Sequence, residues 1–318
     1  MKILVAGWFS FEQMGASAGD LIARDLACSW LDEAGVAYDI ATAAPFTGGV
    51  DCNAVDPRDY DYALFVCGPF GNGPPLLEFL DRFAGRLIGL NLSMLQPLEE
   101  WNPFEFLIER DSSRAANPDM VFGGPPLPQR PANSPSGGVP VVGLVLIDHQ
   151  PEYDTDDHHR AVDDALRRVI AAREMAVVPI DTRLDENRTG LRTAGEVEAL
   201  IARMDVVLTT RLHGTVLALK NGVPVLAVDS VAGGAKVKRQ TEAVGWPTVF
   251  TAERVSDDEL VRAFDYCRTA PARAAAVACR NRAAAGVARI RDQFMAWLDH
   301  RGAFAGRGDV ESRRKVRT

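Results

Sequence analysis

The sequence predicts an α/β protein built from two Rossmann-like domains that face a cleft. Short apolar runs ending in glycine or polar residues alternate with segments of helical periodicity, which is typical of parallel strands joined by crossover helices. The chain has 318 residues, more than a single hydrophobic core usually supports. Residues that break helices and strands concentrate between Phe122 and Pro140, so we expect the two domains to be joined there.

The first half of the chain predicts part of one sheet and a helix that covers it. Three short apolar runs are expected to form strands: Ile3–Ala6, Ala63–Cys67 and Leu87–Leu90. Between the first two runs, Ile22, Leu26 and Trp30 recur at a spacing of four, which places them on one face of a helix.

The second half repeats this rhythm. Its expected strands are Val141–Ile147, Ala176–Ile180, Val206–Thr209 and Val225–Val228. A helix with Val162, Leu166 and Val169 on one side follows the first of them. The last two strands flank a helix that ends at about Asn221, so they form a βαβ unit.

A long C-terminal helix is expected to pack back across the first domain, because Val287, Ile290, Phe294 and Trp297 lie on a single face. The stretch after it is rich in Gly, Arg and Asp, and we expect it to fray. The predicted organisation is therefore a first domain over 1–125, a Pro/Gly-rich linker over 126–139, a second domain over 140–270, the helix over 271–300 and a flexible tail over 301–318.

Composition excludes several classes of function. The net charge of −8 argues against nucleic acid as a partner, because binding the phosphate backbone needs a basic face. No segment approaches the roughly 20 apolar residues that span a bilayer, and the N-terminal apolar run is too short for a signal peptide. The five cysteines show no metal-ligand spacing, and we expect reduced, mostly buried thiols. The expected localisation is cytoplasmic.

The candidate catalytic segment is Arg211-Leu212-His213-Gly214, which follows the strand at 206–209. Ligands of parallel sheets bind beyond the carboxyl ends of the strands, and a helix N-terminus favours a bound anion. Arg211 offers a bidentate fork and His213 a titratable proton, so together they suit a phosphate or carboxylate. The alternative is that Arg211 pairs with a nearby carboxylate and His213 only caps the turn.

The run from Asp205 through Arg211-Leu212-His213-Gly214 to Gly222-Val223-Pro224 resembles the signature of polysaccharide pyruvyl transferases. Other pieces follow in the family's order. They are Gly19-Asp20, Gly68-Pro69-Phe70-Gly71, Arg110-Asp111 with Ser113, Pro118-Asp119, and Lys236. Only five residues separate Ser113 from Asp119, where the family has a full helix, so the acceptor side is expected to be remodelled.

The resemblance implies a GT-B-like fold and transfer of a pyruvyl group from phosphoenolpyruvate to two hydroxyls of a sugar, which forms a ketal. The reaction needs a proton donor and a cationic clamp. We therefore expect His213 and Arg211 to be catalytic, and Arg211, Gly214, Lys236 and Arg110 to bind the donor. Candidate cleft contacts are Gly19, Asp20, Gly68 and His149.

The implied co-substrate is phosphoenolpyruvate, with no further cofactor, and the implied acceptor is a carbohydrate. Peripheral membrane association through a lipid-linked acceptor is left open. Two other functions remain. A glycosyltransferase of the same architecture would bind a nucleotide-sugar, with Asp229 or Glu242 on its ribose. A non-catalytic family member would keep only the scaffold.

A loop with His149, Asp154 and Asp156–His159 carries residue types that ligate metals. Its spacing fits no defined site, and its carboxylates can equally cap the helix that starts near His158. We therefore expect a solvated loop and no metal.

Overall fold

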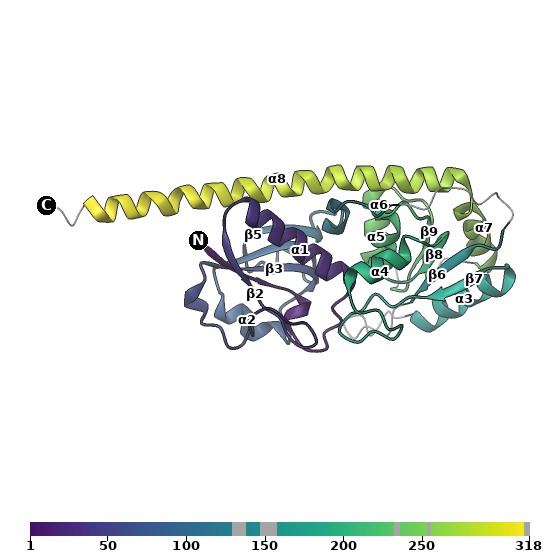
Figure 1. Cartoon of the computed structure of the whole chain (residues 1–318), viewed down its shortest axis with the longest axis horizontal. Coiled ribbons are helices and arrows are strands. Elements are labelled where there is room, and N and C mark those ends of the chain that lie inside the picture. The colour runs from purple at the N-terminus through teal and green to yellow at the C-terminus, as the bar shows by residue number, and fades with distance from the viewer. Residues whose placement is uncertain (129–137, 147–157, 232–235, 253–255, 315–318) are drawn as a thin grey trace.

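The computed structural model describes residues 1–128, 138–146, 158–231, 236–252 and 256–314, with side chains up to Gly302. Two parallel five-stranded sheets are each flanked by helices (Figure 1). Both predicted features, the two α/β domains and the long helix across the first of them, are confirmed. Residues 129–137 of the expected linker lie outside the described residues, so the proposed domain boundaries stay a prediction.

The first sheet has the order β2-β1-β3-β4-β5. Its strands are β1 (Lys2–Ala6), β2 (Ala37–Ile40), β3 (Tyr62–Phe70), β4 (Leu87–Met94) and β5 (Phe104–Asp111). The helices of this domain are α1 (Ala18–Glu33) and α2 (Leu76–Arg82). The expected strands are present, and two of them continue further: β3 runs three residues past Cys67, and β4 four residues past Leu90.

The second sheet has the order β10-β9-β8-β6-β7. Its strands are β6 (Val141–Val145), β7 (Ala176–Pro179), β8 (Val206–Thr209), β9 (Val225–Asp229) and β10 (Val249–Thr251). The helices are α3 (His159–Ala172), α4 (Ala194–Ile201), α5 (Leu212–Lys220), α6 (Lys236–Val244) and α7 (Asp257–Cys267).

Numbered within its own domain, each sheet has the order 2-1-3-4-5. In such sheets the connections leave the first and third strands in opposite directions, and a crevice opens between their carboxyl ends. The crevices lie after β1 and β3 in the first domain, and after β6 and β8 in the second. Because the two domains face each other, the loops after β1, β3 and β8 border the space between them.

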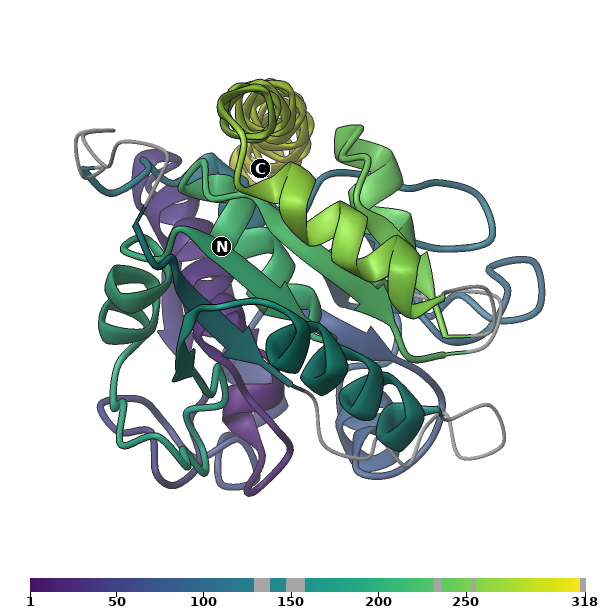
Figure 2. The same cartoon turned by 90° about the vertical axis from the view of Figure 1, so that its right-hand side faces the viewer.

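The C-terminal helix α8 (Ala270–Arg314) runs along both domains and outside both sheets (Figures 1 and 2). Phe294 and Trp297 stack on Phe106 of β5, and Trp297 also contacts Tyr62 edge-on at 5.2 Å between ring centroids. The helix continues to Arg314, and the flexible tail expected over 301–318 stays a prediction. Extending an existing helix needs no new nucleus, so a polar composition alone does not end it.

Within the described residues, no helix combines the length and apolarity needed to cross a membrane. All five cysteines are buried and unpaired by disulfides, as expected. A large apolar core runs through both domains, and a second one lies between the first sheet and α2.

Candidate active site

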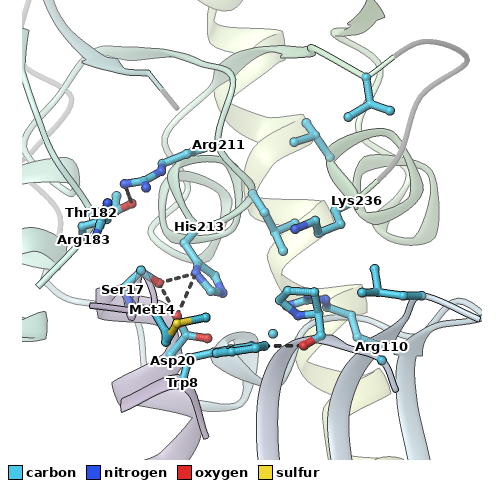
Figure 3. Close-up of a pocket in the computed structure, with 18 of the residues that line it drawn as sticks. Trp8, Met14, Ser17, Asp20, Arg110, Thr182, Arg183, Arg211, His213 and Lys236 are labelled. Carbon is cyan, nitrogen blue, oxygen red and sulfur yellow. Dashed lines mark hydrogen bonds and ion pairs between the residues drawn. The ribbon is translucent and has the colours of Figure 1, made fainter. Parts of the chain in front are cut away.

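A cavity of about 850 Å³ lies between the two domains. Its wall is formed by the loops after β1, β3, β4, β7, β8 and β9 and by the start of α6. The second domain contributes Arg183, Arg211, His213 and Lys236, whereas the wall from the first domain includes Trp8 and Asp20 (Figure 3). The cavity therefore lies where the carboxyl ends of the strands in both sheets meet.

His213 lies in the first turn of α5. Arg211 is the N-cap, and its N–H donates to Thr209 Oγ1 at 2.9 Å. The helix begins at Leu212, one residue before the imidazole. Gly214 packs against the side chains of Thr209 and Val145, and a Cβ there would collide with both. Glycine thus lets α5 start close to β6 and β8.

The first domain holds one edge of the His213 ring. Ser17 is the N-cap of α1, and its Oγ lies 2.5 Å from His213 Nδ1. Asp20 Oδ2 accepts from Ser17 Oγ at 2.7 Å and from Ser17 N at 2.9 Å. The three side chains lie together at the domain interface, as Figure 3 shows, and all are buried. An imidazole from one domain is thus fixed by a helix start of the other.

The opposite nitrogen of the ring faces a buried thiol and a buried carboxylate. His213 Nε2 lies 3.8 Å from Cys67 Sγ and 3.7 Å from Asp119 Oδ2. Burial raises the pKa of the Cys67 thiol well above its usual range, and Asp20 and Asp119 raise it further, so the thiol is neutral. Burial would also raise the pKa of Asp119, but His213 and Arg110 hold it well below the usual range.

Arg110 supports Asp119 from below. It is the largest fully buried side chain of the chain's described part, with 1% of its surface exposed. Its Nη1 lies 2.8 Å from Asp119 Oδ2, its Nη2 donates to Ser93 Oγ at 2.6 Å, and its Nε lies 3.5 Å from Asp111 Oδ2. Burial opposes the charge on Arg110, yet the carboxylates of Asp119 and Asp111 keep its pKa above the usual range. The predicted donor-binding residue is therefore part of a buried network at the cavity floor.

Two arginines of the second domain line the upper wall as members of ion pairs. Arg211 Nη1 donates to Asp181 Oδ1 at 2.9 Å and to Thr182 Oγ1 at 3.2 Å, so the alternative pairing with a carboxylate is real. Arg183 pairs with Asp185 at 2.8 Å. Both arginines line the cavity, and each is oriented by its carboxylate partner.

Among the described residues, Asp20, Cys67 and His213 offer three potential metal-ligand atoms within 4.8 Å of one another. The surroundings oppose a cation there. Arg110 Nη1 lies 3.6 Å from Cys67 Sγ, and the thiol would have to lose a proton that burial holds on it.

The structure brings most of the predicted site residues together. Arg211, His213, Lys236, Asp20 and Gly68 line the cavity, and Arg110 lies at its floor. Two predicted glycines shape the site from behind. Gly19 packs under the His213 ring, and Gly214 packs on the second sheet. His149 lies outside the described residues.

Sequence reasoning missed several residues of the site: Trp8, Ser17, Cys67, Thr182 and Arg183. Asp119 was noted for its resemblance alone and was given no role. The spacing Ser17-x-x-Asp20 is typical of a helix start and can be recognised in the sequence. It indicates a helix cap but does not indicate that the cap contacts His213. The sequence predicts a buried thiol at Cys67, and its burial agrees. Its position beside His213 does not follow from the sequence.

A family model described as polysaccharide pyruvyl transferase matches residues 116–230. The match confirms the resemblance over a range that contains Asp119, Arg211 and His213; residues 1–115 lie outside it. No curated protein matches the chain in sequence.

Solved structures share the fold at low sequence identity. A putative UDP-N-acetylglucosamine 2-epimerase from Listeria monocytogenes has a TM-score of 0.51 at 10% identity, covering 91% of this chain and 94% of its own. A DNA-modifying β-glucosyltransferase has a TM-score of 0.50 at 10% identity, covering 94% of this chain and 100% of its own. The GT-B-like arrangement of two domains is therefore confirmed.

Proposed function

We propose that this chain transfers the pyruvyl group of phosphoenolpyruvate to two hydroxyls of a sugar in a polysaccharide or its precursor. The observation that carries the proposal is the cavity itself. Its lining supplies the proton-transfer group and the cationic clamp that the reaction needs: His213, with Arg211, Arg183 and Lys236.

The proposed chemistry begins at the double bond of phosphoenolpyruvate. A proton adds to the methylene carbon, which becomes a methyl group, and positive charge develops on the adjacent carbon. A sugar hydroxyl attacks that carbon and loses its proton. The carbon–oxygen bond to phosphate then breaks, and a second hydroxyl attacks the same carbon. The products are a cyclic ketal and inorganic phosphate, with one hydroxyl proton retained in the methyl group and the other carried by phosphate.

The residues divide this work by chemical type. His213 is the proton-transfer group, because it is the titratable ring in the cavity and both its nitrogens are positioned by neighbours. Arg211, Arg183 and Lys236 bind the carboxylate and phosphate and stabilise the charge that develops as phosphate leaves. Arg110 acts indirectly, because it holds Asp119 in place beside His213.

The competing nucleotide-sugar reading has less support in this cavity. Asp229 lines it, but its carboxylate oxygens accept from the backbone N–H groups of Val231 and Lys238. Glu242 is exposed on α6 and does not line the cavity. A carboxylate bound to its own loop is a poor partner for a ribose.

The test combines ligand-dependent melting with product analysis. We expect phosphoenolpyruvate to stabilise the wild-type chain by about 2.7 kcal/mol at a hundred times its Kd, which is a shift of several degrees. Arg211→Ala should lose this shift and lower turnover on the order of a hundredfold, as when a group that stabilises transition-state charge is removed. With a sugar diol as acceptor, the product should gain the mass of pyruvate less one water, and phosphate should appear in equal amount.

The matched control is Arg168→Ala. Arg168 pairs with Asp257 on the surface, and 54% of its side chain is exposed. This variant should keep the shift and the turnover. A shift with UDP- or GDP-sugars alone would overturn pyruvyl transfer in favour of a glycosyltransferase.

A further inference from the structure

We propose that Ser17 and Asp20 are positioning residues that keep the proton of neutral His213 on Nδ1. Nε2 is then the nitrogen that exchanges a proton with the substrate. The assignment of the proton follows from the geometry alone. Only the role of Nε2 in proton transfer rests on the proposed function.

Ser17, Asp20 and His213 share few protons among their hydrogen-bonding atoms. The Ser17 hydroxyl has one proton but two close neighbours, Asp20 Oδ2 at 2.7 Å and His213 Nδ1 at 2.5 Å. An ionised carboxylate is acceptor-only, so Ser17 donates to Asp20. The proton in the contact between Ser17 Oγ and His213 must then come from Nδ1. The opposite choice would leave lone pairs of two oxygens facing each other at 2.7 Å.

The start of α1 favours this arrangement. Asp20 lies in the first turn of the helix, where negative charge is stabilised by the dipole, and it also accepts from the N–H of Ser17. Asp20 is 5% exposed and Ser17 is 5% exposed, so bulk water does not compete for these bonds. The hydroxyl is therefore held as an acceptor toward the imidazole.

Nε2 faces two groups with opposite preferences, because the Cys67 thiol can donate to a lone pair whereas the Asp119 carboxylate favours a protonated nitrogen. Cys67 is a neutral thiol that accepts from Asn91 Nδ2 at 3.3 Å and Arg110 Nη1 at 3.6 Å, which leaves its S–H to point elsewhere. Nε2 is 3.8 Å from Sγ, within reach of a weak S–H donor. When Nε2 takes up a proton, Asp119 Oδ2 at 3.7 Å is placed to stabilise the charge.

The chain thus contains an ordered series, carboxylate to hydroxyl to imidazole, in which each group fixes the next. Its ends come from different domains, since Asp20 and Ser17 belong to α1 and His213 to α5. Fixing the tautomer before substrate arrives means that no ring rotation or proton rearrangement is needed during the reaction.

The direct test is ¹⁵N NMR of the full chain labelled on histidine, with His213→Gln used to assign the resonance of His213. In the neutral state we expect a protonated Nδ1 and an unprotonated Nε2. In Ser17→Ala the preference for Nδ1 should be lost, and Ser17→Thr should restore it, because threonine keeps the hydroxyl at a helix N-cap. A proton found on Nε2 in the wild-type chain would overturn the inference.

Turnover distinguishes positioning from simple structural support. Ser17→Ala should lower kcat by about tenfold or more with little change in the KM for the donor, since a misplaced proton-transfer group slows chemistry and not binding. Its matched control is Ser256→Ala, which removes a helix cap of the same kind, paired with Glu259 at the start of α7 and far from histidine. That variant should keep kcat and its pH profile. Equal losses of kcat in the two serine variants would also count against positioning.

The two proposals fail separately. If Nδ1 carries the proton but phosphoenolpyruvate does not bind, the tautomer assignment stands and the proposed donor is wrong. If phosphoenolpyruvate is turned over but Nε2 carries the proton, pyruvyl transfer stands and the role of Ser17 is wrong.

Discussion

At the scale of single residues, the informative feature is a buried charge. Arg110 is enclosed with Asp119 and Asp111, although moving ions out of water costs several kcal/mol per ion and a well-packed apolar group often serves stability better. What the charge achieves is local. The positive charge of Arg110 keeps Asp119 ionised 3.7 Å from His213 Nε2, in a buried place where water could not stabilise that carboxylate instead. We therefore regard the Arg110 network as part of the site rather than of the fold.

Removing the cation should expose the cost of what remains. We expect Arg110→Met to lower the free energy of unfolding by about 3–5 kcal/mol, because Asp119 and Asp111 are left buried without compensation. Arg114→Met nearby is the control. That arginine is 55% exposed, and losing its pair with Glu99 should cost at most about 1 kcal/mol. Urea denaturation measures the free energy of unfolding of both variants. Equal losses would show that Arg110 contributes no more to stability than an exposed arginine.

The ion pair of Arg110 with Asp119 makes the stability lost in Arg110→Met depend on pH. His213 and Arg110 lower the pKa of Asp119 in the folded chain against the opposing effect of burial. A carboxyl with a lowered pKa in the folded state contributes stability above its unfolded pKa of about 3.9 and loses it as the pH falls further. The stability gap between wild type and Arg110→Met should therefore be full at pH 6 and narrow below about pH 4.

At the scale of elements, the contact between α1 and α5 depends on a glycine. Gly19 is the second residue of α1, and a Cβ there would overlap the His213 ring. We expect Gly19→Ala to displace the ring and lower turnover by about a hundredfold, since an error of about 1 Å at a reacting group can cost that much. Alanine favours helices, so local stability should change little or rise within α1 itself.

The control for this change is Gly195→Ala. Gly195 is the second residue of α4, and the nearest atom to a Cβ there is Thr193 Oγ1 at 4.0 Å. This variant should keep full turnover. Kinetics and melting of both variants, measured side by side, separate an effect on His213 from a general effect of alanine at a helix start. Full activity in Gly19→Ala would mean that the ring does not need its observed place.

Sequence reasoning located the central strands and the edge strand β7, and it missed the other three edge strands. Val206–Thr209 was predicted at its observed limits, because buried parallel strands are continuous apolar runs. The missed strands β2, β5 and β10 lie at sheet edges. β2 and β10 are only four and three residues long, and β5 ends in three charged residues, Glu109–Asp111. Short or half-exposed strands lack the run that identifies a central one.

The site was predictable where one segment carries it, and not where two distant segments meet. Arg211 and His213 share a helix start, so their proximity follows from local sequence. Ser17 and His213 are 196 residues apart, and Cys67 and His213 are 146 apart. Such contacts depend on how the two domains dock, which periodicity and spacing within either domain do not determine.

At the scale of the whole molecule, two domains of the same strand order are joined by hydrogen bonds that converge on the cavity. Ala18 N donates to Thr182 O, and Leu184 N donates to Ala16 O, both at 2.8 Å. These backbone bonds join the start of α1 to the segment that orients Arg211 through Asp181 and Thr182. The wall that carries Arg211 and the support of His213 are therefore set by one docked arrangement.

Gln240 of α6 makes the corresponding connection on the other side of His213. Its Oε1 accepts from Asp119 N at 2.9 Å, and its Nε2 donates to Asn117 O at 2.6 Å. Because Gln240 is 1% exposed, Gln240→Ala leaves both backbone groups without a partner, which costs about 1–3 kcal/mol. We expect faster hydrogen exchange at the Asp119 amide and a lower turnover, since the second domain would no longer fix the turn that faces Nε2.

Glu242→Ala on the exposed face of the same helix should change neither exchange nor turnover, because it leaves these bonds intact. Exchange measured by mass spectrometry, with turnover on the same samples, distinguishes two ideas of how the cavity is held. If Gln240→Ala speeds exchange at 117–119 and slows turnover together, domain docking sets the geometry around His213. If exchange rises while turnover is unchanged, the first domain alone holds Asp119 in place, and the Arg110 network suffices.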